Sequence, residues 1–240
     1  MGSRLASNLF TRHARVASDD SATFILVCED QPNMGLPSVF HLHYHVPDVD
    51  YAASLLSTHG ITPTARFGSV DGESVALAPE EDTPPGFTCR LQTNRGGFVD
   101  VTLTPAPRLD FDHFGIVVDD VAGVVERARE RGWSVTENER RTFLVTPWGF
   151  RVELQAADSD VVAELGPSSD CRFTNVSLAV PVEARDDISR GLGAVLGDVH
   201  NLRVVPVRGP KAAVREARVD GDRVEQQQFE MASLVPRETA

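Results

Sequence analysis

The chain has few cysteines and few basic residues. Among its 240 residues are only three cysteines, Cys28, Cys89 and Cys171, and no two of them form a Cys-x-x-Cys pair. An odd number of widely separated cysteines frames neither a disulfide scaffold nor a zinc knuckle. This usage predicts a protein of the reducing cytoplasm.

Long apolar runs are absent as well. The N-terminal segment MGSRLASNLF has no apolar core of signal-peptide length, and no stretch approaches the roughly 20 residues that cross a bilayer. The 23 basic residues are outnumbered by 35 acidic ones, which gives a net charge of -12. That charge repels nucleic acid and anionic membranes, so we expect small-molecule partners and neither a nucleic-acid nor a membrane partner.

An internal repeat is the most informative feature that the sequence does contain. The segment from His41 to Gly60 reappears without a gap as His113 to Gly132. Each copy reads as a strand followed by a helix whose apolar residues recur at i, i+3, i+4 and i+7, and each ends at a glycine. A histidine at the same strand position in both copies indicates two half-sites that face one another.

Further strand patterns follow each copy of the repeat. Alternating segments separated by turn residues predict strands at 62–68, 73–78, 86–92, 97–104, 133–139, 141–147 and 150–156. The order is strand, helix and three or more strands, once over residues 38–108 and again over 109–157. Residues 171–237 show the same order more weakly, with Asn175 in place of the histidine, and we interpret them as a degenerate third module. Residues 1–37 are predicted to form an N-terminal hairpin extension. The chain is therefore expected to be an α+β protein.

This arrangement resembles the vicinal oxygen chelate superfamily, which includes glyoxalase I, extradiol dioxygenases, methylmalonyl-CoA epimerase and fosfomycin or bleomycin resistance proteins. The sharpest likeness is FLVTPWGFRVEL, where Glu153 stands four residues after Gly149 at the position of a metal-binding glutamate in members of that superfamily. The resemblance implies tandem βαβββ modules that form a half-open β-barrel around one divalent metal ion, with ligands from first and last strands.

Strand alternation tests this site independently of the resemblance. In HLHYHV, the side chains of His41, His43 and His45 share one face, and the apolar residues between them share the face that a helix covers. The same alternation places His113 and Glu153 on the face away from the helix. We therefore predict that His41, His113 and Glu153 face one cavity as metal ligands. Two imidazoles and a carboxylate suit Fe(II) best, and they also suit Mn(II) or Zn(II).

Two positions depart from the patterns of known branches. Aligning VTLT with VELQ places Thr102 opposite Glu153, where glyoxalase-like members have a second acid. Asp100 faces the same way nearby. The extradiol pattern has a tyrosine where Phe143 stands, and a histidine shortly before it that this chain lacks.

His43 and His45 are the candidate catalytic residues, because a histidine on the metal face can act as an acid or base near neutral pH. The leading hypothesis is a metal-dependent enzyme that binds a small organic substrate through vicinal oxygens. The substrate would be aromatic if the enzyme is a ring-cleaving dioxygenase. The missing second acid favours a non-haem Fe(II) ring-cleavage dioxygenase over an isomerase or lyase of the glyoxalase or epimerase type.

Two alternatives remain open at the level of sequence. One is a metal-free protein that binds a drug or pathway intermediate, as in the bleomycin-resistance branch. The other is a catalyst in which His43 or His45 moves a proton without a metal. The oligomeric state is open too, because such a barrel forms either within one chain or across a homodimer.

Overall fold

The structure is a computed structural model that describes residues 37–236. The hairpin predicted over residues 1–37 thus lies outside the described residues, apart from its last position. Within residues 37–236, no helix is both long enough and apolar enough to cross a membrane.

Module 1 follows the first copy of the repeat. Its elements are β1 (Ser38–Val46), α1 (Val49–Thr58), β2 (Thr62–Val70), β3 (Glu73–Leu77), β4 (Thr88–Gly96) and β5 (Val99–Pro105). The Asp48 side chain accepts a 2.9 Å hydrogen bond from the Tyr51 N–H and thereby caps the first turn of α1. The helix stops before Gly60, whose φ of 74° is a conformation that glycine adopts at little cost.

Module 2 repeats this construction. Its elements are β6 (Asp110–Val118), α2 (Val121–Glu130), β7 (Ser134–Glu137), β8 (Thr142–Val145) and β9 (Arg151–Ala156), and the short helix α3 (Asp160–Ala163) follows. Asp120 caps α2 through a 2.8 Å bond from the Gly123 N–H, and Gly132 follows the helix with the same φ of 74°. The repeated sequence therefore encodes a repeated local structure.

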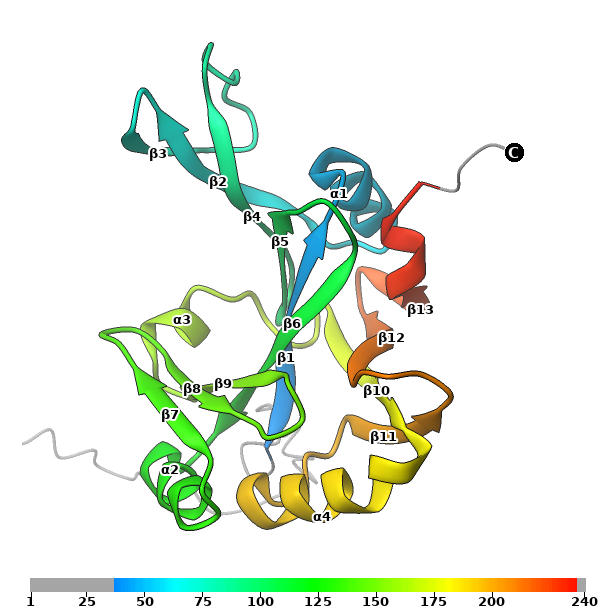
Figure 1. Cartoon of the computed structure of the whole chain (residues 1–240). Helices are drawn as coiled ribbons and strands as arrows, with labels where there is room; N and C mark the ends of the chain where they lie inside the picture. The colour runs from blue at the N-terminus through cyan, green and yellow to red at the C-terminus, as the bar shows by residue number, and fades with distance from the viewer. Residues whose placement is uncertain (1–36, 237–240) are drawn as a thin grey trace, which may run out of the picture. The chain divides into compact units, whose positions relative to one another are not determined.

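The two modules share one nine-stranded sheet with the order β3-β2-β4-β5-β1-β6-β9-β8-β7. The first strand of each module runs parallel to its own last strand, β1 to β5 and β6 to β9. β1 and β6 pair antiparallel at the centre of the sheet (Figure 1). This arrangement confirms the predicted α+β fold and brings the two repeated histidines onto neighbouring strands.

A second sheet contains the C-terminal strands, in the order β11-β10-β12-β13. This region comprises β10 (Arg172–Pro181), η1 (Val182–Ala184), α4 (Arg185–Leu196), β11 (Leu202–Val207), β12 (Ala213–Gly221), β13 (Val224–Glu230) and η2 (Met231–Leu234). Along the chain it has the order strand, helix, three strands. In the sheet, however, β10 pairs in parallel with the next strand, β11, whereas β1 pairs in parallel with the last strand of its module.

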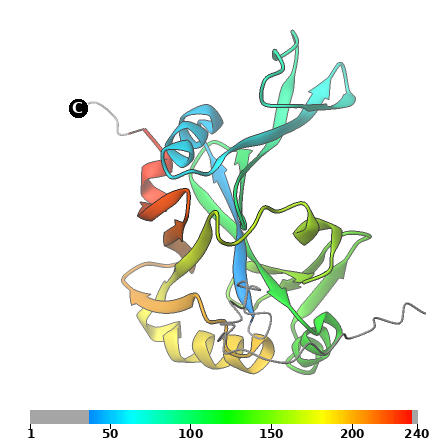
Figure 2. The ribbon, with the colours of Figure 1, turned by 180° about the vertical axis from the view of Figure 1, so that it is seen from behind.

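The two sheets share one hydrophobic core. Leu42 and Tyr44 of β1, Phe114 of β6, and Leu178 and Val214 of the C-terminal sheet all belong to it, and none of them is exposed to solvent. The Tyr44 hydroxyl donates a 3.3 Å hydrogen bond to the Val214 carbonyl, which ties β1 to β12. At another point of this junction, α1 contacts η2, the red segment beside it when the ribbon is seen from behind (Figure 2).

Candidate metal centre

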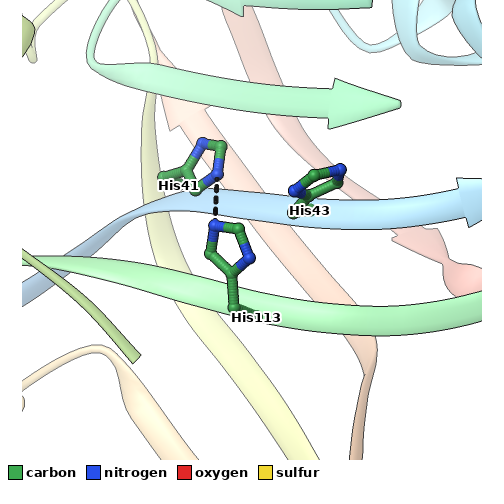
Figure 3. Close-up of side chains that lie close together, drawn as sticks. All are labelled: His41, His43 and His113. Carbon is green, nitrogen blue, oxygen red and sulfur yellow. Dashed lines mark hydrogen bonds between the residues drawn. The ribbon is translucent and has the colours of Figure 1, made fainter. Parts of the chain in front are cut away.

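The two repeated histidines meet where β1 and β6 pair. The Nε2 atoms of His41 and His113 are 3.2 Å apart, and each residue is only 2% exposed. Figure 3 shows the two rings pointing toward one another from the two strands. Gly115 lies opposite His41 in the strand register, and a β-carbon there would come within 2.9 Å of the His41 β-carbon. A glycine at this position leaves room for the imidazole.

Glu153 on β9 completes the group predicted from the sequence. Its Oε2 atom lies 3.4 Å from Nε2 of His113, and the residue is 1% exposed. The Gln155 amide donates a 2.8 Å hydrogen bond to Oε1, whereas Oε2 is buried without a hydrogen-bond partner. A buried charged oxygen with no donor is costly. A cation between Glu153 and the imidazoles would satisfy this oxygen.

The charge state of Glu153 suits this role. Burial raises the pKa of its carboxyl, but the nearby His113 ring and the charges of His41 and Arg141 lower it, with a net pKa of about 2. The side chain is therefore a carboxylate at neutral pH. Two imidazole nitrogens and a carboxylate oxygen form a donor set that divalent Fe, Mn and Zn all accept. The residues present fit a divalent metal ion.

His43 lies beside this group on the same face of β1. One nitrogen from each of His41, His43 and His113 lies within 4.8 Å of the others (Figure 3). Both ring nitrogens of His43 have other neighbours, because Nε2 is 2.8 Å from the Thr104 hydroxyl and Nδ1 is 3.6 Å from Asp112. Burial, followed by the charges of His113 and His41, lowers the pKa of His43 to about 2, so its ring is neutral.

His45, the second predicted catalytic residue, lies one step further along the same face. Its ring centroid is 5.6 Å from that of His43, and the residue is half-buried. With His43 and Asp112 it forms another group whose potential ligand atoms lie within 4.8 Å of one another. The structure thus places His45 next to the predicted metal ligands and outside the His41–His113 contact.

Asp112 is the neighbour that sequence reasoning missed. Its Oδ2 atom lies 3.2 Å from Nδ1 of His113, and the Arg151 guanidinium donates two hydrogen bonds to the same carboxylate. Burial works against the charged form, but the bonds with His113 and Arg151 keep the pKa of Asp112 well below its usual range. A carboxylate on the outer ring nitrogen fixes the orientation of an imidazole ligand.

Asp100 takes the corresponding place in module 1. It is buried, it lies opposite His41 in the parallel register, and its Oδ1 atom is 3.7 Å from Nδ1 of His41. Thr102 lies opposite His43 just as Glu153 lies opposite Gly115, so the register agrees with the alignment made from sequence. Asp100 therefore lies behind His41 and does not occupy the place of a second acidic ligand.

Comparison with known proteins shows which solved structures have a similar fold. No protein-family model matches the chain, and no curated protein matches it in sequence. Its structure is similar to that of a Mn(II)-bound glyoxalase from Novosphingobium aromaticivorans, with a TM-score of 0.54 and 14% identity over 74% of this chain and 63% of that chain. It is also similar to a variant of 4-hydroxymandelate synthase from Streptomyces coelicolor, with a TM-score of 0.50 and 13% identity over 84% of this chain and 62% of that one.

A third similar structure is a fusion protein of a xylose isomerase-like TIM barrel and a 4-hydroxyphenylpyruvate dioxygenase, with a TM-score of 0.51 and 13% identity. The match covers 74% of this chain and 35% of the fusion protein. The chain thus spans less than two thirds of the length of each of these three proteins. The chain has the vicinal oxygen chelate fold.

In this vicinal oxygen chelate fold, the candidate ligands are buried and their neighbours are more exposed. The side chains of His43, Asp112 and Arg151 are 14%, 19% and 39% exposed, whereas those of His113 and Glu153 are 2% and 1% exposed. A molecule that approaches the cluster from solvent therefore meets His43, Asp112 and Arg151 first.

Phe143 lies beside these residues. Its ring packs edge-on against the His113 ring, with 5.1 Å between the centroids, and the Arg151 guanidinium lies 4.8 Å from the Phe143 centroid. Phe143 is itself buried, so its ring packs the His113 ring in place beneath Arg151.

Proposed function

We propose that the chain is a metal-dependent enzyme that acts on a small organic substrate, with a divalent ion held by His41, His113 and Glu153. The observation that carries this proposal is the Oε2 atom of Glu153, a buried carboxylate oxygen without a hydrogen-bond partner, 3.4 Å from Nε2 of His113. The similarity in fold to a Mn(II)-bound glyoxalase supports a metal-dependent reaction.

Glu153 is a better third ligand than His43. Each ring nitrogen of His43 already lies near another polar group, Thr104 on one side and Asp112 on the other. Releasing one of them for a metal would break a contact in a largely buried place. Glu153, by contrast, has one buried carboxylate oxygen without a hydrogen-bond partner. We therefore assign His43 to the substrate side of the site.

The metal ion and the residues around it would have different roles. A bound divalent metal would supply Lewis-acid stabilisation of negative charge on substrate oxygens. Asp112 holds the His113 imidazole in orientation through its outer ring nitrogen, and Asp100 lies 3.7 Å from the outer ring nitrogen of His41. His43, whose ring is neutral, lies at the exposed edge on the substrate side of the ion.

Within this class we favour a non-haem Fe(II) dioxygenase that cleaves an aromatic ring. The support is the donor set, because Thr102 stands where a second acidic ligand would complete a four-ligand site. Three protein ligands leave coordination positions for two substrate oxygens and for O2. The main competitor is a metal-dependent isomerase or lyase that needs no oxygen.

Metal analysis tests the site. The full chain is loaded with Fe(II), Mn(II) or Zn(II), desalted and measured by elemental analysis beside His113→Ala and Glu153→Gln. His200→Ala and Glu137→Gln, which change exposed residues, serve as matched controls. We expect about one ion per chain in the wild type and the controls, and a loss of affinity of about 10–100-fold or more in the two site variants. Metal retained by both site variants would contradict the proposal.

Oxygen dependence then separates the two reactions. The Fe(II)-loaded protein is mixed with a panel of catechols, and O2 uptake is followed together with the absorbance of a ring-opened product. We expect both signals with Fe(II), and neither in Glu153→Gln. Turnover of a substrate under anaerobic conditions with Mn(II) would exclude the dioxygenase and favour the isomerase or lyase.

A further inference from the structure

The C-terminal sheet repeats the strand register of the metal centre. In the antiparallel pair β1–β6 the register skips Phe40 and Asp112, and in the pair β10–β12 it skips one residue of each strand at the corresponding steps. The two pairs can therefore be superposed residue by residue. The positions of His41, His43 and His113 are taken by Asn175, Ser177 and Glu216, respectively.

The neighbouring positions correspond in the same way. Arg203 pairs with Ser177 in the parallel register as Thr102 pairs with His43. Arg218 lies opposite Asn175, in the place that Gly115 has opposite His41. The imidazoles are thus replaced by an amide, a hydroxyl group and a carboxylate, and two guanidinium groups are added. This set of side chains is not one that holds a transition metal.

These polar residues line a hollow of about 510 Å³, which we call the C-terminal hollow. Its lining includes Asn175, Ser177, Arg203, Glu216, Arg218 and Gln228. The residues that alternate with them, such as Val176, Leu178 and Ala217, are fully buried in the core. The hollow therefore lies on the polar face of the C-terminal sheet, and its volume is typical of a small-molecule site.

The charges in the hollow favour an anion. Two arginines face one glutamate, so the local balance is positive in a chain whose net charge is -12. Arg218 already has partners, with Nε 3.0 Å from Oε1 of Gln228 and 3.5 Å from Oε1 of Glu216. Among residues 37–236, the exposed side chain of Arg203 makes no hydrogen bond or ion pair, so its guanidinium is available to a ligand.

Neutral groups in the hollow can bind hydroxyl groups. The Asn175 amide donates a 3.0 Å hydrogen bond to the Ser177 hydroxyl, which leaves the amide oxygen and the hydroxyl hydrogen for a ligand. We propose that the C-terminal hollow binds a small hydroxylated organic anion. Arg203 and Arg218 bind its carboxylate or phosphate group, and Asn175, Ser177 and Gln228 bind its hydroxyl groups.

Calorimetric titration of the full chain tests this proposal with two matched pairs of probes. Gluconate is compared with sorbitol, which has the same carbon chain without the charge, and glycerol 3-phosphate is compared with glycerol. We expect at least one anion to bind with a dissociation constant of about 1 mM or below, and neither neutral probe to bind. Which anion binds distinguishes a carboxylate site from a phosphate site.

Variants locate the binding. Arg203→Gln and Arg218→Gln should each weaken binding about tenfold. Arg208→Gln removes the same charge from an exposed position outside the lining and should leave binding unchanged. The proposal is overturned if neither anion binds at about 10 mM, if the neutral probes bind equally well, or if Arg203→Gln and Arg218→Gln bind like the wild type.

Discussion

Asn201 holds β1 against β10, and replacing it with alanine should strongly destabilise the fold. The side chain is 3% exposed. Its oxygen accepts a 2.8 Å hydrogen bond from the Val39 N–H, and its amide donates bonds of 2.9 Å to the Val39 carbonyl and 3.1 Å to the Phe173 carbonyl. One amide thus bonds three backbone groups at this junction of the two sheets.

The magnitude follows from these three bonds. Asn201→Ala would remove these bonds from one N–H and two carbonyl groups of Val39 and Phe173, which are 2% and 3% exposed. Each buried polar group left without a partner costs about 1–3 kcal/mol. Water that enters the vacated space recovers part of this cost, so we expect a loss of about 3–6 kcal/mol. A loss of this size is a large share of the roughly 5–15 kcal/mol that stabilises a typical protein.

Urea unfolding followed by circular dichroism measures this loss. Asn138→Ala is the matched control, because Asn138 also accepts two backbone hydrogen bonds but lies in an exposed turn. We expect the control to lose at most about 1 kcal/mol, since water replaces the amide there. If Asn201→Ala were no less stable than Asn138→Ala, the argument from buried backbone groups would be wrong.

Three further changes have defined expectations. Gly60→Ala should destabilise the fold more than Gly132→Ala. Both glycines have φ of 74°, but only a β-carbon at position 60 would meet another side chain, a valine of β13, 2.3 Å away. In denaturant unfolding we expect Gly132→Ala to lose about 1–2 kcal/mol of stability and Gly60→Ala to lose about 1–3 kcal/mol more. Asp112→Asn should lower metal affinity about 10-fold or more by loosening His113, as measured by competition with a chelating dye; unchanged affinity would mean that the carboxylate does not orient the ring. Burial, with the nearby carboxylates, raises the pKa of Cys171 to about 11. The folded chain therefore keeps the thiol proton that the unfolded chain releases near pH 9, so this thiol should lower the stability between pH 9 and 11 by at most about 1.4 kcal/mol per pH unit. Cys171→Ala should lose this contribution to the slope of stability against pH.

Strand alternation predicted which side chains of the candidate site share one face of the sheet. It placed His41, His113 and Glu153 on one face, and in the structure Nε2 of His113 lies 3.2 Å from Nε2 of His41 and 3.4 Å from Oε2 of Glu153. The reason is physical, because β-strand side chains alternate strictly wherever the pairing is regular. The repeat likewise revealed both helices, since their caps and apolar positions are local features of the sequence.

Asp112 could not be found in this way. It directly precedes His113, so alternation assigns it to the opposite face of β6. In the structure the register skips Asp112 between the pairs His43–His113 and Tyr44–Phe111, and this irregularity turns its carboxylate toward the ring nitrogen of its neighbour. A bulge of this kind depends on the pairing of two strands, and the sequence of one strand does not reveal it.

The strand order of the C-terminal sheet was hidden for a similar reason. The sequence predicts a strand, a helix and three strands there, and these elements form. Which strand lies beside β10, however, is decided by contacts between segments that are distant in the sequence. Arg127 of α2 donates a 2.9 Å hydrogen bond to the Val195 carbonyl in α4, so this helix is docked against module 2. That contact is between distant segments, which no local pattern encodes.

The pairing of β1 with β6 places both halves of the candidate centre in one chain. Since both halves of the candidate centre belong to one polypeptide, dilution does not separate them, and metal loading should not vary with protein concentration. In a symmetric pair of identical subunits every substitution appears twice. Here each half can change alone, and the two halves differ, with Thr102 in one half and Glu153 at the matching position of the other.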